Sequence, residues 1–236
     1  MAIAFANLGA SANPDIVSST DANSYATSSW APPAADLIWV YVYNQKTGTP
    51  ETPTISGNSL TWTNIATVLL GTTYRVTLFG ANASGSATGV TTIAFGGVTQ
   101  FGCCVSFGSA TGVDLSGGVA AAFVQTPSTS GFAAPPQSVT LSAAGHVDNR
   151  PIMGAGISTN TAHTPRANWT EMDELNMGGG DPFCNLSTQY RSDAFETTAS
   201  VDWTTGTTNY ILLAAELKAT QAIFPTLYVN TPAQRW

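Results

Sequence analysis

The segment HTPRANWTEMDEL, residues 163–175, concentrates the side chains of this protein that are best suited to chemistry. It holds one of the two histidines of the chain, one of its five arginines and three of its carboxylates. An imidazole near carboxylates is suited to acid–base catalysis, and several carboxylates on a flexible loop can bind a hard cation. The simpler alternative is a polar loop in a structural protein, with WTEMDELN forming at most a helical turn capped by Thr170. We expect the loop.

The potential metal ligands lack the spacing of known metal sites. Atoms that zinc uses as ligands are present at His146, Asp148, His163, Cys103, Cys104 and Cys184. They show neither the closely spaced pairs of a structural zinc site nor a helical HExxH pattern. A group of acids that would suit calcium consists of Glu171, Asp173, Glu174 and Asp181. This group lacks the ligand ladder of an EF-hand, so a solvated acidic turn is the simpler interpretation. We expect no metal and no other cofactor.

Two catalytic arrangements have simple structural alternatives. His146 and Asp148 are two residues apart, so a strand would place both on one face, but no serine in a nucleophile elbow accompanies them. Paired carboxylates that hydrolyse glycosides face each other across a cleft, about 5 to 10 Å apart. The carboxylates available for such a pair are Asp193, Glu196, Asp202 and Glu216. Every sandwich of this size contains a few strand carboxylates, and we predict that the protein is not an enzyme.

The composition argues against nucleic-acid and membrane partners. Charged residues make up 9% of the 236 residues, against about 25% in ordinary globular proteins, and the net charge is −7. Lysine occurs only at Lys46 and Lys218, so no basic patch is available to bind phosphates. No apolar stretch approaches the roughly 20 residues that span a bilayer, and the first residues do not read as a secretory signal. The surface is expected to consist largely of Ser, Thr, Asn and Gly.

Alternating apolar residues predict β-strands along the whole chain. In residues 36–44, DLIWVYVYN, both alternating sets of side chains are apolar, so we expect a central strand with two buried faces. Further strands are predicted at residues 59–65, 74–82, 89–97, 101–108, 118–126, 138–143, 152–158, 197–204 and 209–218. The predicted fold class is all-β: an antiparallel two-sheet β-sandwich, jelly-roll-like or lectin-like, with terminal arms. It forms one domain over residues 1–218, including an N-terminal segment 1–30.

The cysteines and tryptophans are assigned mainly to the core. Cys103 and Cys104 are adjacent, so a strand would point them to opposite faces, and a bridge from either one to Cys184 stays open. Flat amphipathic rings that suit sugar faces as well as a sandwich core are present at Trp30, Trp62, Trp169 and Trp203. We favour the core for these rings and keep sugar binding as the alternative.

Both ends of the chain differ from its body. Residues 219–236, ATQAIFPTLYVNTPAQRW, follow the last predicted strand, and leaving their apolar side chains in water would cost about 25 cal/mol per Å². We therefore predict a C-terminal arm that packs on its own sandwich or on a neighbouring molecule. The side chains assigned to contacts between molecules are Ile3, Phe5, Phe224, Leu227, Tyr228 and Trp236.

An ordered series of short motifs carries a resemblance to a known group of proteins over roughly residues 20–218. The most distinctive pieces are GNSLTWT, the strand FGGVTQFGC followed by TGVD, and a late series of WTE, TQYR and a tryptophan strand. In this order they resemble β-sandwich domains of tailed-phage virion proteins and of related uncharacterised phage or bacterial proteins. The resemblance implies a structural role without catalytic residues or a cofactor. It further implies that residues 169–171 form a corner with a buried ring, that residues 189–191 begin a strand, and that Arg191 is available to pair with Glu171.

The predicted function is structural. We expect a virion protein, a capsid decoration or cement protein, that stabilises the particle as a homo-oligomer, a trimer being one option. Its partners are copies of itself and the major capsid protein or another virion protein, and repetition around a shell strengthens weak contacts through avidity. The alternative is a carbohydrate-binding module on a phage tail or on a secreted bacterial protein, with a host glycan as its partner.

Overall fold

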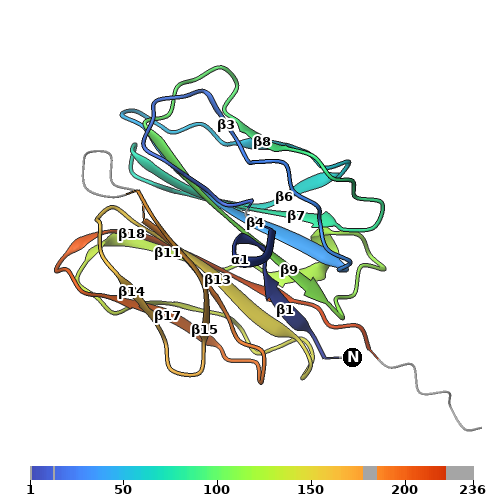
Figure 1. Ribbon diagram of the computed structural model, residues 1–236. Coiled ribbons are helices and arrows are strands. Elements are labelled where there is room, and N and C mark those ends of the chain that lie inside the picture. Colours follow the sequence, from blue (N-terminus) through green and yellow to red (C-terminus); the bar gives the residue numbers. More distant parts are fainter. Residues whose placement is uncertain (1, 13, 178–184, 222–236) are drawn as a thin grey trace, which may run out of the picture.

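The computed structural model describes residues 2–12, 14–177 and 185–221, which form an all-β structure in four layers (Figure 1). Two larger sheets lie face to face at the centre, and a three-stranded sheet covers the outer face of each. Pairing within the sheets is antiparallel, for example between β4 (Leu37–Gln45) and β9 (Gly102–Thr111). The predicted sandwich is therefore confirmed, and the structure adds an outer layer on each side.

The first half of the chain, residues 2–113, builds one central and one outer sheet. Besides β4 and β9, its strands are β1 (Ala4–Asn7), β2 (Ile16–Ser18), β3 (Ser24–Ala26), β5 (Thr54–Gly57), β6 (Trp62–Leu70), β7 (Tyr74–Asn82) and β8 (Thr91–Ala94). The central sheet has the order β1-β9-β4-β7-β6, with β2 also paired to β9, and the outer sheet has the order β3-β8-β5. A short helix, α1 (Leu8–Ala12), connects β1 to β2.

The second half, residues 114–221, builds the other two sheets. Its strands are β10 (Phe123–Gln125), β11 (Ser128–Ala133), β12 (Gln137–Thr140), β13 (Arg150–Ile157), β14 (His163–Pro165), β15 (Thr170–Asn176), β16 (Asn185–Tyr190), β17 (Thr198–Trp203) and β18 (Thr208–Leu217). The central sheet has the order β10-β18-β13-β16-β15, with β11 also paired to β18, and the outer sheet has the order β12-β17-β14. A single 3₁₀ turn, Ala120–Ala122, precedes β10.

The two halves repeat one strand order. The series β9-β4-β7-β6 corresponds to β18-β13-β16-β15, and β3-β8-β5 corresponds to β12-β17-β14. Both β6 and β15 shift register near their starts, between Asn64 and Ala66 and between Glu171 and Asp173. Across the centre, β6 packs on β18 and β11, while β15 packs on β9 and β2. This reciprocal packing is that of two similar halves related by an approximate twofold axis.

Strand β4 shows why the sheets stack in layers. Its odd-numbered residues from Leu37 to Tyr43 join the core between the two central sheets, and its even-numbered residues from Ile38 to Val42 join the core beneath the outer sheet. All of these side chains are buried, as predicted for a strand that is apolar on both faces. An apolar outer face must be covered, and the small sheet β3-β8-β5 covers it.

Aromatic side chains on β4 fill space that glycines leave on its counterpart β13. A Cβ atom on Gly154 would lie 2.4 Å from Tyr41, and one on Gly156 would lie 2.9 Å from Tyr43. The registers of β4 on β7 and of β13 on β16 make Tyr41 equivalent to Gly154 in the repeat. The Tyr41 hydroxyl also donates a hydrogen bond to the carbonyl of Leu213 at 3.1 Å. The central core is therefore asymmetric near its axis.

The structure corrects the expectation for residues 163–175. Most of this segment forms β14 and β15 instead of a polar loop with a helical turn. β15 pairs with β16 along its length, and the side chain of Met172 is buried in the central core. The register shift within β15 interrupts the alternation that would have revealed a strand. The strand start predicted at residues 189–191 is also wrong, because β16 ends at Tyr190.

The first residues of the chain lie on its own sandwich. Ile3 is 3% exposed and belongs to the central core. Phe5 packs against the rings of Trp39 and Tyr190, with centroid separations of 5.7 and 4.5 Å. Because Ile3 is almost fully buried, little of its surface is available to another molecule. The contact between molecules that the sequence predicted for Ile3 and Phe5 stays a prediction.

The described fold continues slightly beyond the expected boundary at residue 218. Ala219 is fully buried and forms a bridge with Val113, and the Thr220 N–H donates to the carbonyl of Gly112 at 2.8 Å. The four C-terminal residues assigned to contacts between molecules, Phe224, Leu227, Tyr228 and Trp236, lie outside the described residues.

Candidate functional site

His163 is buried between β14 and β15. Its side chain is fully covered, and its backbone N–H donates to Glu174 Oε1 at 3.0 Å. The ring Nδ1 lies 3.6 Å from the same oxygen, and neither ring nitrogen has a hydrogen-bond partner among the described residues. Burial lowers the pKa of His163 to about 4, so the imidazole is neutral at neutral pH. A covered neutral ring is poorly placed to exchange protons with a molecule at the surface.

The neighbouring arginine belongs to a charged clamp, which consists of Arg166, Arg191 and Glu196. Arg166 Nη2 lies 2.8 Å from one Glu196 oxygen, and Arg191 Nη1 binds the other. The indole N–H of Trp169 donates to Glu196 at 3.1 Å. The ring of Trp169 is buried, as the resemblance implied, but Thr170 and Glu171 belong to strand β15, so the predicted corner of residues 169–171 is wrong. The partner of Arg191 is Glu196 instead of Glu171, so the predicted pairing is replaced.

His146 and Asp148 lie in a turn before β13, and not on a strand as the catalytic arrangement required. His146 Nδ1 accepts the backbone N–H of Asp148 at 3.2 Å and lies 3.8 Å from its carboxylate. Two of the carboxylates considered for glycoside hydrolysis also make local contacts: Asp193 binds Arg191 at 2.9 Å, and Asp202 accepts the Trp203 N–H at 2.7 Å. These contacts fix turns and strand ends.

Glu216, the remaining carboxylate of that group, is fully buried on β18. One of its oxygens accepts the Gly145 N–H at 2.8 Å and the side-chain amide of Asn149 at 2.5 Å. The other accepts the side-chain amide of Gln125 at 2.5 Å. Glu216 therefore holds the loop before β13 against β18 and β10, and it does not face Asp193, Glu196 or Asp202 across a cleft.

A pair of carboxyl groups that the sequence did not indicate joins the two halves. Asp15, directly before β2, and Asp173, on β15, share a hydrogen bond. Asp15 also accepts the Phe107 N–H at 3.0 Å, while Asp173 accepts the Ser106 hydroxyl at 2.6 Å and the Asn7 amide at 2.7 Å. Burial, and then repulsion by Asp173, raises the pKa of Asp15 from 3.8 to about 8. At neutral pH Asp15 therefore keeps its proton, which it donates to the carboxylate oxygen of Asp173.

The metal ligands considered in the sequence do not gather. Within residues 2–12, 14–177 and 185–221, no group of three or more His, Cys, Asp or Glu side chains is placed to hold a metal ion. Cys103 and Cys104 are buried on opposite faces of β9, as expected, and burial raises the pKa of both thiols. Neither thiol forms a disulfide, so the bridge to Cys184 that the sequence left open does not form in this structure. Asp181 and Cys184 themselves lie outside the described residues.

The tryptophans considered as sugar platforms differ in their surroundings. Three of them, Trp30, Trp169 and Trp203, are buried in a core, and each indole N–H donates to a protein acceptor. Trp62 is only partly buried, and its Nε1 is covered but has no hydrogen-bond partner in the described part of the chain. Of the four tryptophans, Trp62 is therefore the one that is neither fully buried nor hydrogen-bonded through its N–H.

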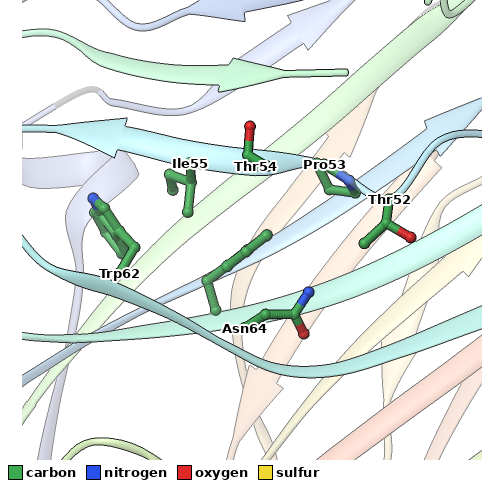
Figure 2. Close-up of a pocket in the computed structure, with 7 residues that line it drawn as sticks. Thr52, Pro53, Thr54, Ile55, Trp62 and Asn64 are labelled. Carbon is green, nitrogen blue, oxygen red and sulfur yellow. The ribbon is translucent and has the colours of Figure 1, made fainter. Parts of the chain in front are cut away.

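Trp62 lines a pocket of about 510 Å³ between the outer and central sheets of the first half. The lining residues come from the segment leading into β5 and from β5, β6 and β7, and they are Thr52, Pro53, Thr54, Ile55, Trp62, Asn64 and Phe79. Figure 2 shows Ile55 and Trp62 near one end of the pocket and Thr52 and Asn64 toward the other, while the side chain of Thr54 points away from them. None of the seven side chains is charged.

Comparison with known proteins finds no match for this chain. A scan against protein-family models finds no match for the chain, and searches of curated proteins and of solved structures find none either. No helix among the described residues is long and apolar enough to cross a membrane. The pocket and the polar contacts described above are therefore the basis for a functional proposal.

Proposed function

We propose that the chain is a structural protein of a tailed-phage virion, a capsid decoration or cement protein that covers the particle in many copies. The observation that carries this proposal is the use of the polar side chains. Glu196 joins two arginines, Glu216 fixes a loop, and Asp173 joins the two halves. The carboxylates that could have served catalysis or metal binding thus hold the backbone in place. This use fits a protein whose role is structural.

Two further features support the proposal. Four stacked layers bury apolar faces on both sides of the central sheets, which gives a rigid unit for repeated use on a surface. The net charge of −7 with only 9% charged residues lowers the chance of non-specific ionic capture of nucleic acid. The short motifs that resemble phage virion domains point the same way.

The C-terminal arm is the part of the chain that this proposal assigns to the particle. Ala219 and Thr220 belong to the sandwich, so a truncation must follow Gln221 to leave it intact. The residues removed include the apolar side chains Phe224, Leu227 and Tyr228. On the particle, burial of these side chains against a neighbour would strengthen each contact, and repetition would multiply the effect.

Binding to particles tests the proposal directly. The full chain and a chain that ends at Gln221 are added to particles assembled without the protein, and bound protein is measured by sedimentation. We expect saturable binding of the full chain in a fixed ratio to the capsid protein, and binding weaker by about tenfold or more after truncation. Absence of the full chain from the particles would refute a virion role. A truncated chain that loses its cooperative thermal transition would refute the separate arm.

A further inference from the structure

The pocket beside Trp62 has an equivalent place in the second half, and there it is filled. Trp62 and Trp169 occupy the same position of the repeat, one residue before the corresponding residues Thr63 and Thr170. Trp169 is 7% exposed, and its N–H is satisfied by Glu196 of the charged clamp. The comparison shows that this fold can close the space between the outer and central sheets with its own side chains.

The first half leaves the same space open. The position of Gln189, whose amide donates to the carbonyl of Ser200, is occupied by Phe79. Phe79 is 3% exposed and forms an apolar floor, while Trp62 and Ile55 form partly exposed walls. The buried N–H of Trp62 has no acceptor among the described residues. An unpaired buried donor is unfavourable, so Trp62 does not belong to a fully satisfied core as Trp169 does.

The polar groups of the pocket lie at its rim. Thr52 and Asn64 are exposed and offer a hydroxyl and an amide, which both donate and accept hydrogen bonds, while the Thr54 hydroxyl already donates to the carbonyl of Ala94 at 3.3 Å. The absence of charge from the lining disfavours an ionic ligand, whose lost hydration would not be compensated. A ligand that matches this set is neutral, has flat apolar faces for the rings and carries several hydroxyl groups. A pyranose sugar has these properties.

The size and position of the pocket agree with such a ligand. Small-molecule sites usually enclose about 300 to 1,000 Å³, and this pocket encloses about 510 Å³. It lies between two edge strands, since β5 pairs only with β8 and β6 only with β7 among the described strands. A chain of sugars can therefore continue past the rim without meeting another strand.

We propose that the space between β5 and β6 is a binding site for a neutral saccharide, stacked on Trp62 and hydrogen-bonded by Asn64 and Thr52. A structural protein with this site would also recognise a glycan. The proposal does not depend on a place in the virion, because it concerns one pocket of the isolated chain.

Indole NMR signals provide the test. The chain has six tryptophans, and Trp62→Phe identifies the Trp62 signal by deleting it while keeping an aromatic wall. The probes are neutral tetrasaccharides of glucose, galactose, mannose and N-acetylglucosamine, each added to the full chain up to about 10 mM, a range that covers weak millimolar binding. We expect at least one of them to shift the Trp62 signal in a saturable manner, with the signal of Trp169 unchanged.

Variants of Trp62 test the stacking. Because they lack the Trp62 signal, their binding is measured by saturation-transfer NMR of the saccharide. Trp62→Phe, which keeps a smaller ring, is expected to weaken binding by roughly tenfold, and Trp62→Ala to abolish it. Phe132→Ser is the matched control, because Phe132 is an aromatic side chain that is 69% exposed in the other half. It should leave binding unchanged, and the remaining indole signals report that each variant is folded. The proposal is overturned if no probe shifts the Trp62 signal, or if binding survives Trp62→Ala.

Discussion

The shared proton between Asp15 and Asp173 makes a quantitative prediction for the pH dependence of stability. Asp15 has a pKa of about 8 in the folded protein, against 3.8 for an ordinary aspartate, mainly because of burial and then because of Asp173. Between these two values the folded protein holds a proton that the unfolded chain has released. Stability therefore falls as the pH rises, by up to about 1.4 kcal/mol per pH unit, and the loss is complete above the folded pKa.

His163 acts in the opposite direction over part of the same range. Burial lowers its pKa from 6.5 to about 4, so between these values the unfolded chain binds a proton that the folded protein does not. Stability then rises with pH by a similar amount, and the contributions of His163 and Asp15 largely cancel below pH 6.5. From pH 6.5 to about pH 8 only Asp15 contributes, and the expected loss is about 2 kcal/mol.

Asp15→Asn isolates this effect. An asparagine amide can donate to Asp173 and its oxygen can accept the Phe107 N–H, so the variant resembles protonated Asp15 without titrating. Urea unfolding of both proteins, followed by tryptophan fluorescence from about pH 4 to about pH 9, measures the difference in free energy of unfolding. We expect the advantage of the variant to grow by about 2 kcal/mol between pH 6.5 and 8. Parallel stability profiles for the two proteins over this range would refute the shared proton.

Three further substitutions test other parts of the structure, each by urea unfolding. His163→Gln removes the contribution that offsets that of Asp15, so the variant should gain stability relative to the wild type as the pH falls from 6.5 toward 4, by up to about 1.4 kcal/mol per pH unit; profiles that stay parallel over this range would mean that His163 does not titrate there. Glu216→Gln places an amide against three donors and should cost about 2 to 3 kcal/mol at neutral pH, so an unaltered stability would contradict the role of this carboxylate. Gly154→Ala should cost about 1 to 3 kcal/mol through overlap with Tyr41, and Tyr41→Leu should recover part of it if that overlap is the cause.

The long strands were predictable because they are apolar on a regular period. β4, β7 and β18 alternate or are continuously apolar over nine or ten residues, and the sequence located each of them closely. The strands β3, β5 and β14 are three or four residues long, too short for any period to emerge. They form because an outer apolar face needs cover, which is a property of the assembled fold.

The segment 163–175 was misassigned for a local reason. Thr170 followed by acidic residues resembles the start of a helix, and the register shift within β15 hides its alternation. Pairing with β16 decided the conformation. The contact between Asp15 and Asp173 joins residues far apart in the chain, so nothing near either of them in the sequence predicts it. The sequence does show one sign of the repeat: the dipeptide Trp-Thr occurs at equivalent positions of the two halves, residues 62–63 and 169–170.

The tyrosine and glycine positions near the twofold axis make recognition between the halves directional. If two first halves met as the two halves of this chain do, Tyr41 of one would collide with Tyr41 of the other, because the space that receives it exists only beside Gly154. Each half therefore packs better on the other half than it would on a second copy of itself. In this respect the two halves resemble the two different subunits of a heterodimer. This face is already occupied within each molecule, so copies that assemble must use the outer sheets, the free strand edges or the ends of the chain.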